Sequence, residues 1–130
     1  MEKIIKIQDA INFSQFAKAH EDDNIPFSLA HRIYKIYISL INDIEFYYTK
    51  QKGIIEQFAQ KNELGEVVHN DEQGTISLNP DTIEECKKAL DELEELEVTL
   101  DFVPITEEEL SNCGIKVKLS EMAAIEQFIA

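Results

Sequence analysis

The sequence has little of several residue types on which functional sites depend. It has no Trp and only two cysteines, Cys86 and Cys113, which form no CxxC motif. Two cysteines without a framework favour free thiols packed as small hydrophobic residues. None of the three histidines has a second His or Cys three or four positions away, whereas a zinc site needs three or four converging donors. We therefore expect no metal and no cofactor.

Catalytic signatures are missing as well. The sequence has no GxSxG motif, no phosphate-binding P-loop and no GxGxxG motif. The acids around Asp71 lack the twelve-residue ligand spacing of a calcium-binding loop. Asp81 followed by Glu85-Cys86-Lys87 resembles the acid and ExK pattern of metal-dependent nucleases, but both parts fall in one predicted helix. The sequence predicts a protein that is not an enzyme, and a small hydrolase is the least favoured alternative.

Long apolar runs and a secretory signal are also absent. No apolar stretch approaches the roughly 18 residues that span a bilayer, so we expect no membrane contact and a cytoplasmic location. The length of 130 residues, with 44% hydrophobic and 29% charged residues, is that of an ordinary globular protein. We expect one domain over residues 1–130 with a single core.

The negative charge is concentrated in one part of the chain. Residues 1–53 carry seven Lys or Arg and seven Asp or Glu, whereas residues 54–130 carry five against nineteen and hold the whole net charge of −14. Such a field repels nucleic acid and anionic membranes and attracts basic protein surfaces. We therefore expect no direct binding of nucleic acid, and a protein partner with a basic surface.

Hydrophobic periodicity predicts an α+β fold. A short strand over 3–7 leads into a helix that ends near His20, and Pro26 prevents its continuation. Apolar residues then recur at helical spacing and predict one long helix over about 28–62. Within that helix, Gly53 marks either a kink or a break into two helices.

The ends of the long helix and of its neighbour carry capping signals. Ser28 is the predicted N-cap of the long helix, and Gly65 is the predicted stop. Residues 66–79 contain two strand candidates about a polar loop and predict a β-hairpin. Asn79 then begins a helix over 80–97 with apolar residues at the spacing of a helix-pair seam. We predict a long helical hairpin with a β-hairpin at its tip.

The last third of the chain predicts a small C-terminal β/α element. The alternating residues 98–102 indicate a strand. Thr106 and Glu109 match a capping box, which predicts a short helix after Thr106. A second alternating segment, 115–119, predicts another strand, and Ser120 is placed to cap a terminal helix.

Acidic side chains on the predicted 80–97 helix are the main candidates for binding a partner. They are Glu84, Asp91, Glu92, Glu94 and Glu95. Such a row imitates a line of phosphates, so an alternative function is an inhibitor that mimics nucleic acid and occupies a basic groove. The simpler interpretation is a solvated face that serves solubility, and Lys87 and Lys88 interrupt the row.

The long helix carries a second group of candidates, an aromatic-rich stretch between Tyr34 and Tyr48. Such residues are usually core. A helix of this length would extend about 50 Å, which is more than the width of a small domain. Tyr37 and Tyr48 are therefore also candidates for contact with a partner, including a second copy in a homo-oligomer.

The order of elements resembles a family of small uncharacterised proteins of tailed phages that infect Gram-positive bacteria. The likeness covers most of the chain and is carried by apolar patterns at residues 10–13, 30–36, 63–66 and 119–129. The resemblance implies a phage product that acts in the host cytoplasm or in the virion, and it brings no activity or site residues. We expect a phage accessory or assembly protein that acts by protein–protein binding, or alternatively an acidic inhibitor of a host defence enzyme.

Overall fold

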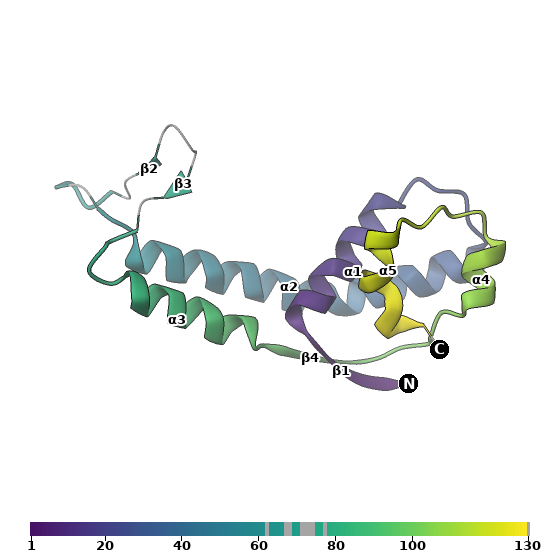
Figure 1. Ribbon diagram of the computed structural model, residues 1–130. Helices are drawn as coiled ribbons and strands as arrows, with labels where there is room; N and C mark the ends of the chain where they lie inside the picture. Colours follow the sequence, from purple (N-terminus) through teal and green to yellow (C-terminus); the bar gives the residue numbers. More distant parts are fainter. Residues whose placement is uncertain (62, 67–68, 71–74, 77, 130) are drawn as a thin grey trace. The chain divides into compact units, whose positions relative to one another are not determined.

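The protein has an α+β fold, as the sequence predicts. The computed structural model describes residues 1–61, 63–66, 69–70, 75–76 and 78–129. Within them, the elements follow the order β1-α1-α2-β2-β3-α3-β4-α4-α5, with a 3-10 helix, η1, after α5 (Figure 1). The strands form two small antiparallel sheets, β1 with β4 and β2 with β3.

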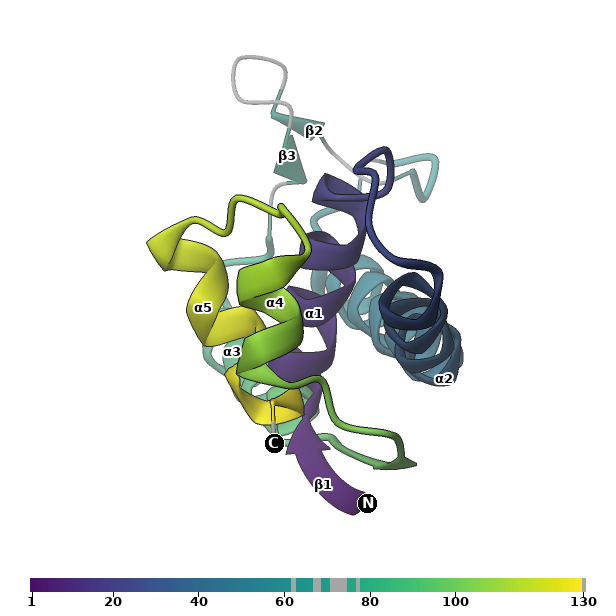
Figure 2. The ribbon, with the colours of Figure 1, turned by 90° about the vertical axis from the view of Figure 1, so that its right-hand side faces the viewer.

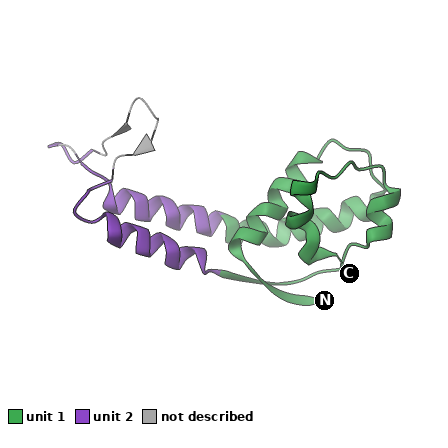
Figure 3. Ribbon diagram, viewed as in Figure 1, with its two compact units in different colours: residues 1–44, 97–130 green, residues 45–96 purple. Residues whose placement is uncertain are grey.

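The chain divides into two compact units. Unit 1 comprises residues 1–44 and 97–130, and unit 2 comprises residues 45–96 (Figure 3). Helix α2 contributes residues to both units, and each of the other elements lies within one unit. The single domain over 1–130 stays a prediction.

Unit 1 begins with a two-stranded sheet that the sequence did not predict. Strand β1, Glu2–Lys6, pairs antiparallel with β4, Glu97–Asp101, which places Ile5 opposite Val98. Both strands were expected as elements, and their pairing was not. Ile5 and Val98 are both buried, so the alternation of the two strands directs one face of the ribbon into the core.

Helices α1 and α5 pack together in the core of unit 1 (Figure 2). Helix α1, Ile7–Ala19, buries Phe13 completely, and η1, Glu126–Phe128, buries Phe128. The Phe13 and Phe128 rings lie 4.4 Å apart between centroids, and Phe102 meets Phe128 edge-on at 5.4 Å. This aromatic cluster joins the first and last parts of the sequence.

The long helix α2 spans Phe27–Phe58 as one helix. Of the two alternatives at Gly53, the break is absent, because Gly53 lies inside the helix, and the kink stays a prediction. The predicted cap was wrong: the helix begins before Ser28, and the Ala30 N–H donates to the Pro26 carbonyl at 3.0 Å.

The predicted end of α2 near residue 62, with its stop at Gly65, was also wrong. The backbone leaves the helix after Phe58, whose carbonyl accepts a hydrogen bond from the Asn79 N–H at 2.9 Å. Ala59 then forms an antiparallel bridge with Leu78. This pairing takes backbone groups that a longer helix would need. Gly65, with φ of 80°, lies in a later turn.

In unit 2, helix α3 lies beside the C-terminal part of α2 (Figures 1 and 3). Helix α3 spans Ile83–Glu94, which is shorter than the predicted 80–97. Asn79 does not cap it directly; its side chain accepts from the Asp81 N–H at 3.1 Å in a turn that precedes the helix. Glu97, predicted to end this helix, belongs to β4.

The predicted β-hairpin is described only in part. Strand β2, His69–Asn70, pairs antiparallel with β3, Thr75–Ile76. The rest of the two predicted strands and of the loop between them, residues 67–68, 71–74 and 77, lies outside the described residues.

In the C-terminal segment, the predicted strand over 98–102 and both predicted helices are present, whereas the predicted strand over 115–119 and the predicted cap Ser120 were wrong. Helix α4, Glu107–Asn112, begins at the predicted capping box. Residues 115–118 form no strand, and Leu119, at the end of that predicted segment, is 90% exposed. Helix α5, Leu119–Ile125, begins before the predicted cap Ser120, because the Lys118 N–H donates to a Glu121 carboxylate oxygen at 3.0 Å. Because of that bond, Lys118 is the N-cap of α5.

Candidate functional site

The acidic side chains of α3 and of its C-cap residue, Glu95, form an exposed surface, which we call the acidic face. It consists of Glu84, Asp91, Glu92, Glu94 and Glu95, all of them exposed. At about 100° per residue, Glu84, Asp91 and Glu95 lie within about 40° of one another around the helix, and Glu92 and Glu94 lie about 80° to either side of that line. The opposite side of α3 carries Cys86, which is fully buried and a free thiol, as predicted.

The surroundings of the acidic face are negative too. Unit 2 holds thirteen acidic and five basic residues, a formal charge of −8. Glu84, Asp91 and Glu92 form no ion pair or side-chain hydrogen bond with another described residue. Their carboxylates are therefore available to a cation from outside.

Helix stability accounts for the position of Glu84 but not for those of Glu92 and Glu94. Acids at a helix N-terminus interact favourably with the helix dipole, and Glu84 in the first turn does so. The last turn of α3 contains no basic residue, and Glu92 and Glu94 lie there, at the negative end of the dipole. Acids in that position cost roughly 0.3–1 kcal/mol each at an exposed site.

Tyr48, one of the predicted partner-binding residues, is in unit 2 with the acidic face. It is 47% exposed and meets Tyr47 edge-on, with 5.4 Å between ring centroids. Burial raises the pKa of Tyr47, and the charge of Glu94 raises it further. The structure thus brings Glu94 of α3 near Tyr47 of α2, so aromatic and acidic groups meet in this unit.

Tyr37, the other predicted tyrosine, belongs to unit 1 and lines a pocket there. The pocket measures about 420 Å³ and lies between the end of α1, the following loop and the first turns of α2. Phe16, Ile33 and Tyr34 contribute apolar walls, and His20 lies at the same pocket. Tyr37 is half-buried, so it contributes to the wall of this pocket more than to an open surface.

His20 is held by two carboxylates that the sequence did not connect with it. Its Nδ1 lies 2.5 Å from Asp23 Oδ2, and its Nε2 lies 2.7 Å from Glu121 Oε2. A neutral imidazole has one donor and one acceptor, so two carboxylate partners require the doubly protonated ring. Burial alone would lower the pKa of His20, but the hydrogen bonds to Asp23 and Glu121 outweigh it, and the pKa is raised.

Glu121 takes part in a second interaction that supports the same link. The hydrogen bond from the Lys118 N–H lowers the pKa of Glu121; burial opposes this shift, and the contact with His20 adds to it. His20 and Glu121 are 101 positions apart in the sequence, so no local pattern indicates their contact. With both ring nitrogens occupied, His20 serves as a cross-link and has no free nitrogen to accept a proton from a substrate.

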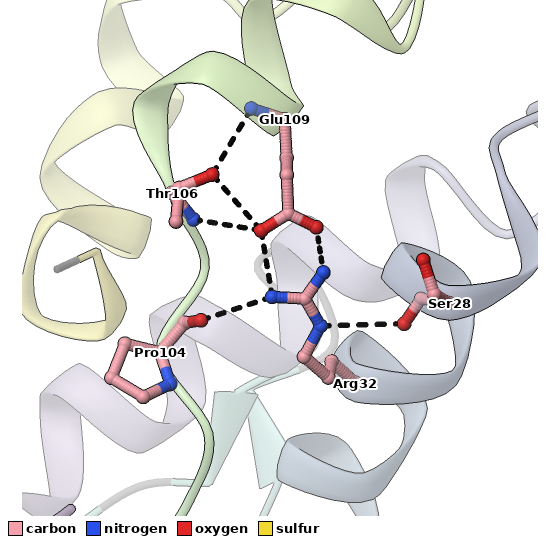
Figure 4. Close-up of polar contacts among 5 residues, drawn as sticks. All are labelled: Ser28, Arg32, Pro104, Thr106 and Glu109. Carbon is pink, nitrogen blue, oxygen red and sulfur yellow. Dashed lines mark hydrogen bonds and ion pairs between the residues drawn. The ribbon is translucent and has the colours of Figure 1, made fainter.

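A second cross-link in unit 1 joins α2 to α4 (Figure 4). The Arg32 guanidinium pairs with both carboxylate oxygens of Glu109 and donates to the Pro104 carbonyl at 3.1 Å. Glu109 also accepts from the Thr106 N–H at 3.3 Å, and its own N–H donates to the Thr106 hydroxyl at 3.2 Å. One carboxylate therefore closes the capping box and anchors α2.

Comparisons with known proteins add no family to these observations. No protein-family model, curated protein or solved structure matches this chain. Among the described residues, no three or more His, Cys, Asp or Glu side chains are grouped so as to hold a metal ion. Within the same part of the chain, no helix has the length and apolar character to cross a membrane.

Proposed function

We propose that this chain is a non-enzymatic phage accessory or assembly protein that binds a protein partner through the acidic face of α3. The partner's surface is basic. The observation that carries the proposal is the position of Glu92 and Glu94, exposed in the last turn of α3, where acids oppose the helix dipole. Residues that weaken their own helix indicate a role other than stability.

The charge of the surroundings supports the same partner. A surface of net negative charge attracts a basic protein before contact and aligns it on the acidic face. Tyr48, half-exposed in the same unit, supplies an aromatic contact of the kind enriched at protein interfaces. We propose that a helical hairpin with a β-hairpin at its tip serves as the rigid support of this surface in the host cytoplasm or the virion.

The state of His20 supports binding in place of catalysis. It is the histidine that lies at a pocket of unit 1, and both of its ring nitrogens are occupied by carboxylates. A general base needs a free nitrogen within hydrogen-bond distance of its substrate. His20 thus links two segments of unit 1 and is not free to act as a general base.

The test is capture of partners from a lysate of the Gram-positive host by the immobilised full-length chain. We expect a basic protein to be retained at about 0.05 M salt and released at about 0.5 M, where the Debye length is roughly 4 Å. The variant in which Asp91, Glu92, Glu94 and Glu95 are all changed to Lys should retain none of it.

A matched control separates the acidic face from net charge. It changes four exposed acids of unit 1 to Lys and therefore has the same total charge as the test variant; these acids are Glu2, Asp22, Asp43 and Glu126. We expect the control to bind as the unchanged chain does, apart from a modest loss of long-range attraction. Equal loss of binding in both variants would show that the acidic face has no special role.

The same experiment decides between two kinds of partner. If the captured protein binds nucleic acid and the chain competes with a DNA or RNA duplex for it, the acidic face acts as a mimic of phosphates and the chain inhibits a host defence enzyme. If nucleic acid does not compete, the partner uses a basic surface of another kind. Lys87 and Lys88, both exposed beside the acids, favour the second outcome.

A further inference from the structure

Helix α2 carries an apolar stripe on the side that faces away from the core of unit 1, which we call the outer stripe. Its residues in unit 1 are Phe27, His31, Tyr34, Ile38 and Ile41, separated by four, three, four and three positions. Phe27 is 81% exposed, Tyr34, which also lines the pocket of unit 1, is 58% exposed, Ile38 is 45% exposed, and Ile41 is half-buried. His31 is exposed and stacks on Phe27, with 5.6 Å between ring centroids.

The outer stripe lies opposite the residues that anchor α2. Leu29, Ile36 and Leu40 are buried, and each follows a residue of the stripe by two positions. Two positions correspond to about 200° around a helix, so the two rows occupy opposite sides. A surface helix normally has one apolar side, and a helix that is apolar on both sides is normally covered on both.

The spacing of the stripe identifies what covers it as another helix. Alternation of three and four positions keeps the apolar residues on one seam of a helix that packs against a second helix at a small angle. The second helix needs an apolar seam of the same three-four spacing. A second copy of α2 supplies such a seam without any other protein.

Charge also favours a second copy over a basic partner. Helix α2 has four basic and three acidic residues, a formal charge of +1 in a chain of −14. A basic protein is attracted elsewhere on the chain, whereas two copies of α2 approach each other without the repulsion that the acidic segments would cause.

The order of charges along α2 selects an antiparallel pair. Lys35 lies in the first half of the stripe, and Asp43 and Glu45 follow its end. A parallel pair would place like charges opposite one another. An antiparallel pair centred between Ile38 and Ile41 places each Ile38 opposite Ile41 of the partner subunit, and each Lys35 near Glu45 of the partner subunit.

We propose that two copies of this chain form an antiparallel dimer through the outer stripes of their α2 helices. The dimer is separate from the binding function proposed for the acidic face, because it uses a different helix. Salt distinguishes the two. Screening weakens the attraction between the acidic face and a basic protein, but it reduces the repulsion between two copies of the same acidic chain.

Sedimentation equilibrium of the full-length chain tests the proposal over about 1 µM to 1 mM, the range in which moderate-affinity dimers dissociate. We expect a mass of twice 14.9 kDa at high concentration, retained or strengthened at about 0.5 M salt. A chain that remains monomeric throughout this range, at low and at high salt, would overturn the proposal.

Substitutions on α2 test the surface itself. Ile38→Glu and Tyr34→Glu place a charge within the seam and should weaken the dimer at least about tenfold. Both side chains are substantially exposed, so far-UV circular dichroism should show an unchanged fold. Ser39→Glu adds the same charge to an exposed position of α2 next to the stripe and should change the dimer little. Equal weakening by Ser39→Glu would refute the assignment of the stripe.

A charge exchange tests the antiparallel arrangement. Lys35→Glu alone should weaken the dimer several-fold, because it places like charges near each other across the pair. Adding Glu45→Lys restores opposite charges and the original net charge, so the double variant should recover most of the lost affinity. A double variant that stays as weak as Lys35→Glu would exclude this register. The Ile38→Glu monomer should still bind a basic partner through the acidic face.

Discussion

Charge reversal at the two ends of α3 tests the physical argument behind the proposed function. Glu94→Lys and Glu84→Lys each change the net charge of the chain by the same amount, and both side chains are exposed. The two residues lie at opposite ends of the helix dipole. We expect Glu94→Lys to stabilise unit 2, and we expect Glu84→Lys to destabilise it.

The magnitude follows from the positions of the two residues. An exposed charge at a helix end interacts with the dipole by about 0.3–1 kcal/mol, and reversal changes an unfavourable interaction into a favourable one, or the opposite. Glu94→Lys also places a cation three positions after Asp91, whereas Glu84→Lys places one before Lys87 and Lys88. We expect about 1 kcal/mol of stabilisation in the first variant and about 1 kcal/mol of destabilisation in the second.

Urea denaturation followed by far-UV circular dichroism measures this difference. With an m-value of about 2 kcal/mol per molar urea, a difference of about 2 kcal/mol separates the two midpoints by about 1 M. A shift of both midpoints in the same direction by the same amount would refute the argument, because net charge alone would then explain it. Binding to a basic partner should fall in both variants, including the stabilised Glu94→Lys.

Three further predictions concern unit 1. Phe128→Ala removes a fully buried ring and should cost about 3–5 kcal/mol in urea denaturation. Thr106→Ala removes the hydroxyl that caps α4 and should cost about 1 kcal/mol in the same measurement, with Thr106→Ser as its control. The pKa of His20 is higher in the folded chain than its ordinary value of 6.5. Protonated His20 therefore stabilises the folded state fully below pH 6.5, and this contribution is lost as the pH rises through the folded pKa. In the unchanged chain, the urea midpoint should therefore fall as the pH rises over about 6–9, and His20→Gln should abolish this pH-dependent fall. If the midpoint of the variant falls with pH as much as that of the unchanged chain, the ion pairs at His20 are contradicted.

The sequence predicted most elements whose formation depends on neighbouring residues. The capping box of Thr106 and Glu109 starts α4 as expected, because both groups lie within one helical turn. Helix α2 was predicted because its buried row repeats at helical spacing over many turns. Glu84, Asp91 and the other acids of α3 were predicted as exposed candidates for the same reason, since the seam of that helix determines which side they occupy.

Boundaries were predicted less well where two distant segments compete for the same backbone groups. The end of α2 was placed four residues too late, because the hydrogen bond from Asn79 to the Phe58 carbonyl depends on a segment 21 positions away. Residues 115–118 alternate like a strand, but a strand needs a hydrogen-bonded neighbour, and within the described residues β1 pairs with β4 instead. The local sequence pattern does not show which segments pair with each other.

The sequence alone determined the net negative charge of this protein and its location after residue 53. It also showed no recognisable catalytic motif. Only the tertiary structure decided which side chains meet. It joined His20 to Glu121 and Arg32 to Glu109, and it left the outer stripe of α2 exposed while burying the opposite side. The physical reason is that periodicity and capping act over a few residues, whereas contacts between distant segments depend on how whole elements pack.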